Sequence, residues 1–215
     1  MLPDHIEAVL FDFDGTLAPN LDLPSMRREV IALTNRYAVP APVYEGEYIV
    51  EIIRVSTDYL RCQDEAVAQA YFAEAHDLIR DIEIRASRAT RQFDGVDQLL
   101  ASLRARGLRT GVVTRNCREA VLQVYPALLQ DTDILIARDD TQHIKPDPRH
   151  LLAALGALDS APASAAMVGD GVLDMKVGKL AGMYCIGVLS GSSDRRALLG
   201  AGADTVINTC LLLHR

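Results

Sequence analysis

Two aspartates near the start of the chain interrupt a run that is otherwise apolar. The stretch EAVLFDFDGTLAP predicts a buried strand, and Asp12 and Asp14 stand where that strand runs out at Gly15. Residues two apart in a strand face the same side, so both carboxylates can point into one site. A lone buried carboxylate costs several kcal/mol or stays protonated, so the pair indicates a positively charged ligand or partner. Taken alone, Asp14 and Gly15 are equally typical of a simple turn.

Three further stretches place polar side chains at the ends of other predicted strands. In GVVTRN, Thr114 precedes a helix that Asn116 is expected to cap, and a hydroxyl beside the free N–H groups of a helix start can bind an anion. In HIKPDP, Lys145 lies in a loop beside a proline, and MVGDGVLD ends a strand at Asp170 and repeats a carboxylate at Asp174. Each stretch alone also fits an ordinary strand threonine, a solvated lysine or a glycine turn.

The elements that must position these side chains alternate along the chain. Short apolar runs bounded by turn residues predict strands at residues 6–13, 108–114, 133–137, 165–169, 184–189 and 204–207. Most of these runs are followed by a helical pattern, which is typical of parallel strands joined by helices. Ligands of such sheets bind at the carboxyl ends of the strands. We therefore expect an α/β fold with a Rossmann-like parallel sheet and the site at that edge.

One long segment breaks the alternation. From residue 19 to about residue 90 the pattern gives no convincing strand and predicts helices at residues 25–37, 47–61 and 65–87. A crossover between parallel strands needs only about a dozen residues, so this segment is expected to be an inserted all-helical domain. We place it at residues 19–91, with the core at residues 1–18 and 92–215.

The order of these motifs resembles that of the haloacid dehalogenase superfamily, whose members carry DxD, a Thr or Ser, a Lys and a GDxxxD-type motif in this order. The matching stretches here are DFDGT, VVTRN, KPDP and GDGVLD, and the resemblance covers nearly the whole chain. The helical insert then corresponds to the family's cap domain. KPDP and the MKVGKLAG that follows GDGVLD resemble the phosphoglycolate phosphatase-like branch, although APNLDLP after DGTL departs from that branch.

The resemblance implies a phosphatase that hydrolyses a small phosphate monoester through an aspartyl phosphate. Asp12 would attack phosphorus, and Asp14 would protonate the leaving oxygen and then take a proton from water. Thr114 and Lys145 complete the expected catalytic set. The expected phosphate-binding residues are Thr114, Arg115, Asn116 and Lys145.

A divalent cation is also expected, because aspartates crowded around a dianionic phosphate would repel one another. Mg²⁺ suits oxygen ligands together with a substrate phosphate. By the resemblance, the metal is bound by the Asp12 carboxylate, the Asp14 backbone carbonyl and Asp170. Asp174 would lie just outside, where it orients water or Lys145.

The second acid favours a phosphate ester over other substrates of the superfamily. Members that dehalogenate or cleave phosphonates lack an aspartate at the position of Asp14, because their leaving groups need no such proton. Two alternatives remain. A phosphomutase of the β-phosphoglucomutase type would use the same residues, and a receiver-type signalling domain would also combine Asp, Thr and Lys, although it needs only about 120 residues and no insert.

Composition narrows the partners and the compartment. The formal net charge of −7 argues against duplex nucleic acid or an anionic membrane as the main partner, and a small phosphorylated metabolite remains allowed. No apolar run approaches the roughly 20 residues of a membrane span, and the N-terminus does not resemble a signal peptide, so we expect a cytoplasmic protein. The oligomeric state stays open. The widely spaced Cys62, Cys117, Cys185 and Cys210 are expected to be reduced and mostly buried thiols.

Arginines of the helical insert permit two interpretations. Together with Tyr59 they could bind a second anionic group of the substrate. Alternatively they form a solvated face or pair with acids such as Glu83, which is the commoner situation for exposed charge. The residues in question are Arg54, Tyr59, Arg61, Arg85, Arg88 and Arg91.

Overall fold

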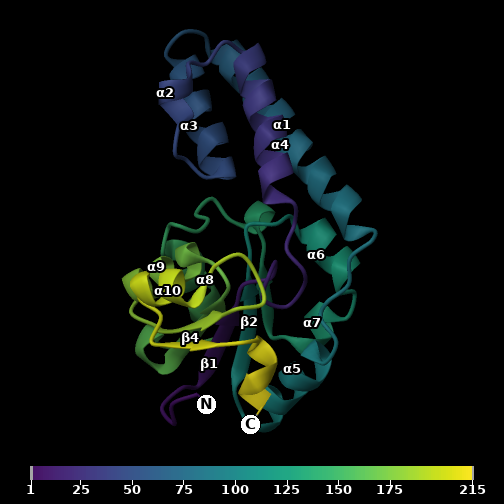
Figure 1. Cartoon of the computed structure of the whole chain (residues 1–215), viewed down its shortest axis with the longest axis vertical. Coiled ribbons are helices and arrows are strands. Elements are labelled where there is room, and N and C mark those ends of the chain that lie inside the picture. Colours follow the sequence, from purple (N-terminus) through teal and green to yellow (C-terminus); the bar gives the residue numbers. More distant parts are fainter. Residues whose placement is uncertain (1, 215) are drawn as a thin grey trace. The chain divides into compact units, whose positions relative to one another are not determined.

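The computed structural model describes residues 2–214 and divides the chain into two compact units (Figure 1). An α/β unit consists of the described residues up to Leu21 and from Ser87 onward, and a helical unit consists of residues 22–86. In chain order the helical unit follows the first strand and precedes the second. The expected α/β class with a helical insertion is therefore what the chain adopts.

A parallel sheet forms the centre of the α/β unit. Its strands are β1 (Ala8–Phe11), β2 (Arg109–Val113), β3 (Ile134–Ile136), β4 (Ala165–Gly169), β5 (Tyr184–Val188) and β6 (Thr205–Ile207). They are ordered β3-β2-β1-β4-β5-β6, and every neighbouring pair is parallel. Each strand lies within a run that the sequence predicts as a strand, which confirms the expected Rossmann-like sheet.

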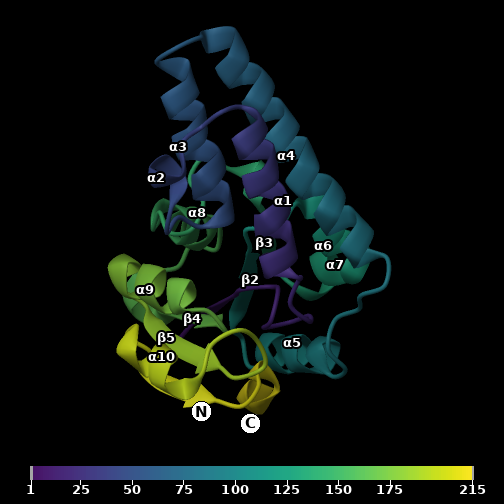
Figure 2. The ribbon, with the colours of Figure 1, turned by 45° about the horizontal axis from the view of Figure 1, so that its top comes forward.

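Helices cover both faces of this sheet (Figures 1 and 2). They are α5 (Val96–Ala105), α6 (Arg118–Val124), α7 (Leu128–Asp131), α8 (Arg149–Ala157), α9 (Val172–Ala181) and α10 (Arg195–Gly200). Val9 and Phe11 of β1 pack in the same cluster as α5 and α6, whereas Ala8 and Leu10 pack with α8 and α9. Because alternate residues of β1 enter two separate cores, the strand reads as a continuous apolar run.

The strand order reverses beside β1, which places the ends of three strands together. From β1 the chain builds β2 and β3 on one side and then returns to build β4, β5 and β6 on the other. Phe11 pairs with both Val112 and Val168, and the Asp12 N–H donates to the Val168 carbonyl at 2.9 Å. Ligands of open α/β sheets bind at such a reversal, so a ligand site is expected at this edge of the sheet.

The helical unit has its own core. Its helices are α1 (Leu23–Arg36), α2 (Ala41–Tyr44), α3 (Ile49–Arg61) and α4 (Glu65–Ser87), the last of which ends at the first residue of the α/β unit's second segment. Val30, Leu33, Ile53 and Tyr71 are among its buried residues. The sequence predicts the three long helices to within two residues, but it misses α2, because one turn is too short to show a periodic pattern.

Two general expectations can be compared with the described residues. All four cysteines are free thiols, and Cys117, Cys185 and Cys210 are buried while Cys62 is exposed. Within residues 2–214, no helix combines the length and the apolar composition needed to span a membrane.

Candidate active site

Lys145 links two of the predicted carboxylates. Its Nζ lies 2.7 Å from Asp12 Oδ1 and 2.7 Å from Asp174 Oδ1. The side chains of Lys145, Asp174 and Asp12 are 2%, 5% and 13% exposed, so both ion pairs are largely shielded from solvent while Asp12 stays partly accessible. Burial opposes the ammonium charge, but the two carboxylates outweigh it and raise the pKa of Lys145. Lys145 is therefore a fixed positive charge that holds Asp12 in one orientation.

Asp170 is held by the loop that follows β5. Its Oδ2 accepts hydrogen bonds from the Ser192 N–H at 2.6 Å and from the Ser192 hydroxyl at 2.8 Å. Gly15, at φ +82°, packs so closely that a Cβ there would come within 2.6 Å of the Asp170 carboxyl carbon. The Ser190 hydroxyl donates to the Gly15 carbonyl at 2.7 Å, which ties this loop to the DFDGT turn.

Ser192 is a site residue that the sequence argument missed. The signal that could have indicated it is the small-residue turn SGSS placed directly after a strand, at the same edge of the sheet as the other motifs. Burial, followed by repulsion from Asp174, raises the pKa of Asp170, and the two hydrogen bonds from Ser192 oppose that rise. Ser192 therefore favours the ionised form of Asp170.

Three carboxylates come close enough to share a cation. Asp12, Asp170 and Asp174 each offer an oxygen, and these atoms lie within 4.8 Å of one another. Burial raises the pKa of Asp12 well above its usual range, with Asp174 and Asp170 adding to the effect and Lys145 opposing it. Three carboxyl groups share the single positive charge of Lys145, so a further cation would favour the ionised form of all three. An all-oxygen donor set of this kind fits a hard divalent cation.

This grouping differs in detail from the expected metal ligands. The resemblance implies that Asp174 lies just outside the metal, whereas in the structure one of its oxygens belongs to the group and Oδ1 holds Lys145. Its Oδ2 accepts the Gly171 N–H at 3.1 Å, in the capping position of α9. The Asp14 carboxylate instead contacts Asn116.

Asn116 contacts Asp14. Its Nδ2 lies 3.2 Å from Asp14 Oδ1 and 3.1 Å from Asp14 Oδ2, and its Oδ1 accepts the Cys117 N–H at 2.8 Å. Helix α6 begins at Arg118 with Cys117 as its N-cap residue, so the expectation that Asn116 caps this helix is wrong. The side chain turns back toward Asp14 instead of reaching the N–H groups of the first helical turn.

Thr114 and Arg115 form the loop between β2 and α6. Thr114 is buried, and its hydroxyl oxygen accepts the Asn116 N–H at 3.1 Å. The Arg115 guanidinium donates to the Lys145 backbone carbonyl, and the Arg115 carbonyl accepts from Arg138 at 2.8 Å. Arg115 thereby connects the VVTRN stretch to the KPDP stretch through the backbone carbonyl of Lys145.

His150 fixes the backbone of Lys145 from the other side. Its Nδ1 accepts the Lys145 N–H at 3.1 Å, so the proton of the neutral ring belongs on Nε2, which lies 3.2 Å from the Ile136 carbonyl. His150 is fully buried in α8. Burial first, and then the positive charge of Lys145, lower its pKa to about 3. The ring therefore stays neutral while it connects the Lys145 loop to the end of β3.

We expect His150 to make the fold acid-sensitive. The unfolded chain takes up this proton near pH 6.5, whereas folded His150 does so only near pH 3. The contribution of neutral His150 to the free energy of unfolding is complete above pH 6.5 and is lost as the pH falls toward 3. The loss is roughly 3 kcal/mol at pH 4, since one pKa unit corresponds to about 1.4 kcal/mol. His150→Asn keeps an acceptor for the Lys145 N–H and does not titrate. Denaturant unfolding at pH 7 and pH 4 should show the variant losing less stability than the wild type, and equal losses would contradict the prediction.

Arginines of the helical unit largely pair with neighbouring acids. Arg54 lies 3.5 Å from Asp58, and Arg61 lies 2.6 Å from Asp58 and 3.2 Å from Glu65. All of these side chains are about half exposed or more. For Arg54 and Arg61 the contacts match the solvated-face interpretation.

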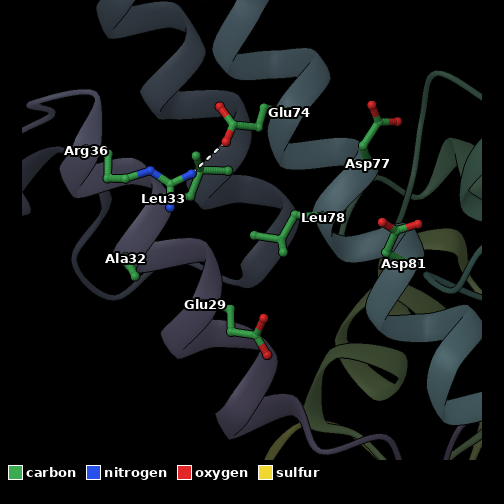
Figure 3. A pocket seen from close by; sticks show the side chains of 8 residues that line it. All are labelled: Glu29, Ala32, Leu33, Arg36, Glu74, Asp77, Leu78 and Asp81. Carbon is green, nitrogen blue, oxygen red and sulfur yellow. Dashed lines mark hydrogen bonds and ion pairs between the residues drawn. The ribbon is translucent and has the colours of Figure 1, made fainter.

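A groove of about 380 Å³ lies between α1 and α4 of the helical unit (Figure 3). Its lining includes the exposed acids Glu29, Glu74, Asp77 and Asp81, and Arg36 pairs with Glu74 at 2.6 Å. Exposed carboxylates on helices are normal at a protein surface, so we assign no chemistry to the groove.

A family model confirms the expected superfamily. The model of the haloacid dehalogenase-like hydrolases matches residues 6–182, which include all four motifs. The chain therefore belongs to the haloacid dehalogenase-like hydrolases.

Characterised relatives differ in their substrates. A phosphonoacetaldehyde hydrolase from Bacillus cereus is 31% identical over 206 residues, which cover 88% of this chain and 78% of the relative. The pyrophosphatase PpaX from Bacillus cereus is 29% identical over 182 residues, which cover 83% of this chain and 81% of the relative. The relatives thus support a hydrolase but not one substrate.

Solved structures share the fold. A haloacid dehalogenase-like hydrolase from Bacteroides fragilis has a TM-score of 0.70 at 24% identity, covering 97% of this chain and 99% of its own. A predicted phosphoglycolate phosphatase from Haemophilus somnus has a TM-score of 0.66 at 18% identity, covering 96% of both chains.

Proposed function

We propose that this protein is a Mg²⁺-dependent phosphatase that hydrolyses a small phosphate monoester. The observation that carries the proposal is the ion pair between buried Lys145 and the partly accessible Asp12, which lies two residues before a second acid, Asp14. An oriented carboxylate can act as a nucleophile toward phosphorus, and a neighbouring carboxyl group can manage the protons.

The reaction then runs in two displacements. A carboxylate oxygen of Asp12 attacks phosphorus as the ester P–O bond breaks, and Asp14 gives its proton to the leaving oxygen. Asp14 next takes a proton from water, the water oxygen attacks phosphorus, and the bond to Asp12 breaks to release phosphate. Lys145 and the hydroxyl of Thr114 stabilise the charge that spreads over the phosphoryl oxygens.

A bound Mg²⁺ would supply the positive charge that lets an anionic nucleophile approach an anionic phosphate. Asp12, Asp170 and the backbone carbonyl of Asp14 are the proposed ligands. Asp174 holds Lys145 and adds its charge beside them. We also propose that the helical unit acts as a cap that excludes water from this chemistry.

Cleavage of a phosphonate is less compatible with this chain. Breaking a C–P bond beside an aldehyde leaves a carbanion, which an amine can stabilise by forming a Schiff base with the aldehyde. The chain has three lysines, Lys145, Lys176 and Lys179. Lys145 is buried as an ammonium between two carboxylates, and Lys179 pairs with Asp204. The helical unit contains no lysine, and Asp14 has a purpose only where a leaving oxygen needs a proton.

Phosphate release from a panel of phosphorylated metabolites tests the proposal. The panel should contain phosphate monoesters, pyrophosphate and phosphonoacetaldehyde, each assayed with and without Mg²⁺. We expect turnover of one or more monoesters that requires Mg²⁺, with one phosphate released for each ester consumed. Substrate consumed without release of phosphate would indicate a mutase, and turnover of phosphonoacetaldehyde alone would refute the proposal.

Ser192 provides a test of the metal proposal. Ser192→Ala removes one of the two hydrogen bonds that orient Asp170, and loss of a group that orients a metal ligand typically costs 10–100-fold in metal affinity. Since the backbone N–H bond remains, we expect the Mg²⁺ concentration for half-maximal activity to rise by about 10-fold, the lower end of that range. Ser193→Ala in the same turn is the matched control. An unchanged Mg²⁺ requirement in the Ser192 variant would contradict the prediction.

A further inference from the structure

Asn116 lies in the loop that the sequence assigns to phosphate, yet its polar atoms contact the protein. The side-chain Nδ2 donates to both oxygens of Asp14, and Oδ1 accepts the Cys117 N–H. The backbone N–H donates to the Thr114 hydroxyl, and the backbone carbonyl accepts the Arg138 N–H at 3.0 Å. Only 3% of the residue is exposed.

These contacts fix the direction of the amide. A flipped amide would turn Oδ1 toward the Asp14 carboxylate and Nδ2 toward the Cys117 N–H, so that like groups face each other at both ends. The Asn116 amide therefore has one favourable orientation, in which its donor side faces Asp14. Using the same N–H groups for a phosphate would break the contact with Asp14.

The residue on which Asn116 acts is the proposed proton carrier. Asp14 must deliver a proton to the leaving oxygen and accept one from water, so its carboxyl group has to stay within reach of both. A donor placed against both oxygens limits rotation of the carboxyl group and so holds it in one orientation. The backbone of Asp14 is fixed by the tight turn that follows it, in which the Gly15 N–H donates to the Ala18 carbonyl at 2.6 Å.

We infer that Asn116 is a positioning residue for Asp14 and not a ligand of the substrate phosphate. The inference rests on the proposed phosphatase function. If Asn116 positions the proton carrier, its loss should slow proton transfer to the leaving oxygen. The effect on the rate should then be largest for esters whose leaving group departs poorly without a proton. A phosphate ligand would instead affect every ester alike.

A series of esters with similar shape and different leaving groups separates the two roles. p-Nitrophenolate departs without a proton, phenolate benefits from one, and the alkoxide of benzyl phosphate needs one. For Asn116→Ala we expect kcat/KM with benzyl phosphate to fall at least about 10-fold more than with p-nitrophenyl phosphate, because general acid catalysis contributes about 10²–10⁴. Asn116→Leu fills the same space without a donor and should show the same dependence, so a cavity alone cannot account for the result.

Thr114→Val is the matched control, because it alters the proposed phosphate contact in the same loop. It should lower kcat/KM for all three esters by similar factors. If the Asn116 variants lose activity equally with all three esters and inorganic phosphate inhibits them more weakly, Asn116 is a phosphate ligand and the inference is overturned. Wild-type protein that hydrolyses neither these esters nor any monoester of the metabolite panel would refute the proposed function itself, which is a different outcome.

Discussion

Asp12→Asn is expected to abolish turnover of p-nitrophenyl phosphate, with a loss of at least about 10⁴-fold, the scale seen when a nucleophile is removed. An amide oxygen does not form the acyl phosphate on which both displacements depend. The fold should survive, because Asn replaces a carboxylate whose charge is disfavoured by burial and by Asp174. The measurements are phosphate release and the thermal unfolding midpoint, which should stay equal or rise.

The matched control for this variant is Asp4→Asn, which makes the same chemical change at an exposed position. It should leave both measurements unchanged. Retained activity in the Asp12 variant, at more than trace level and with verified protein identity, would refute the assignment of the nucleophile. A large fall in the unfolding midpoint would instead show that Asp12 is needed as a partner for Lys145.

Lys145→Met is expected to cause the largest loss of stability. Removing the ammonium leaves the carboxylates of Asp12 and Asp174 buried without their shared partner, and breaking a buried ion pair in this way costs about 3–5 kcal/mol. Denaturant unfolding in the presence of EDTA measures this loss without compensation by a divalent ion. Activity should also fall, because the variant lacks the charge that we propose to stabilise the phosphoryl oxygens.

A double variant tests the electrostatic cause. Adding Asp12→Asn to Lys145→Met neutralises one of the two stranded carboxylates, so part of the lost stability should return. If the loss of unfolding free energy in the double variant equals the sum of the losses in the two single variants, lost packing and not stranded charge explains the instability of Lys145→Met. A Lys145→Met protein as stable as the wild type would show that the pair contributes nothing to the fold.

The positions of the chemical motifs could be predicted because parallel strands share an edge. Asp12, Thr114 and Asp170 follow β1, β2 and β4, which are neighbours in the sheet, so apolar runs and their order along the chain were enough to bring them together. The two carboxylates that pair with Lys145 were harder to predict from the sequence. The Lys145 loop precedes α8, and only the folded backbone shows that Nζ reaches both Asp12 and Asp174.

Residues that orient the site were harder to find from sequence. Ser192 lies in a turn of small residues, and His150 lies on the buried face of a helix, where a histidine is usually part of the core. Asn116 was misinterpreted because an asparagine just before a helix is typical of a cap. The deciding contacts of Ser192 and Asn116 are with residues 22 and 102 positions away, and that of His150 depends on how the Lys145 loop folds back on α8, so local patterns reveal none of them.

The central place of β1 affects when the site can form during synthesis. Both neighbours of this strand come from far along the chain, with Ala8 paired to Arg109 on one side and to Ala165 on the other. Domains commonly begin to fold on the ribosome from the N-terminal end. Here the whole helical unit is synthesised between β1 and its first partner, and β2 and β3 are also synthesised before its second. Asp12, the proposed nucleophile, therefore has no complete pocket around it until β4 has been made.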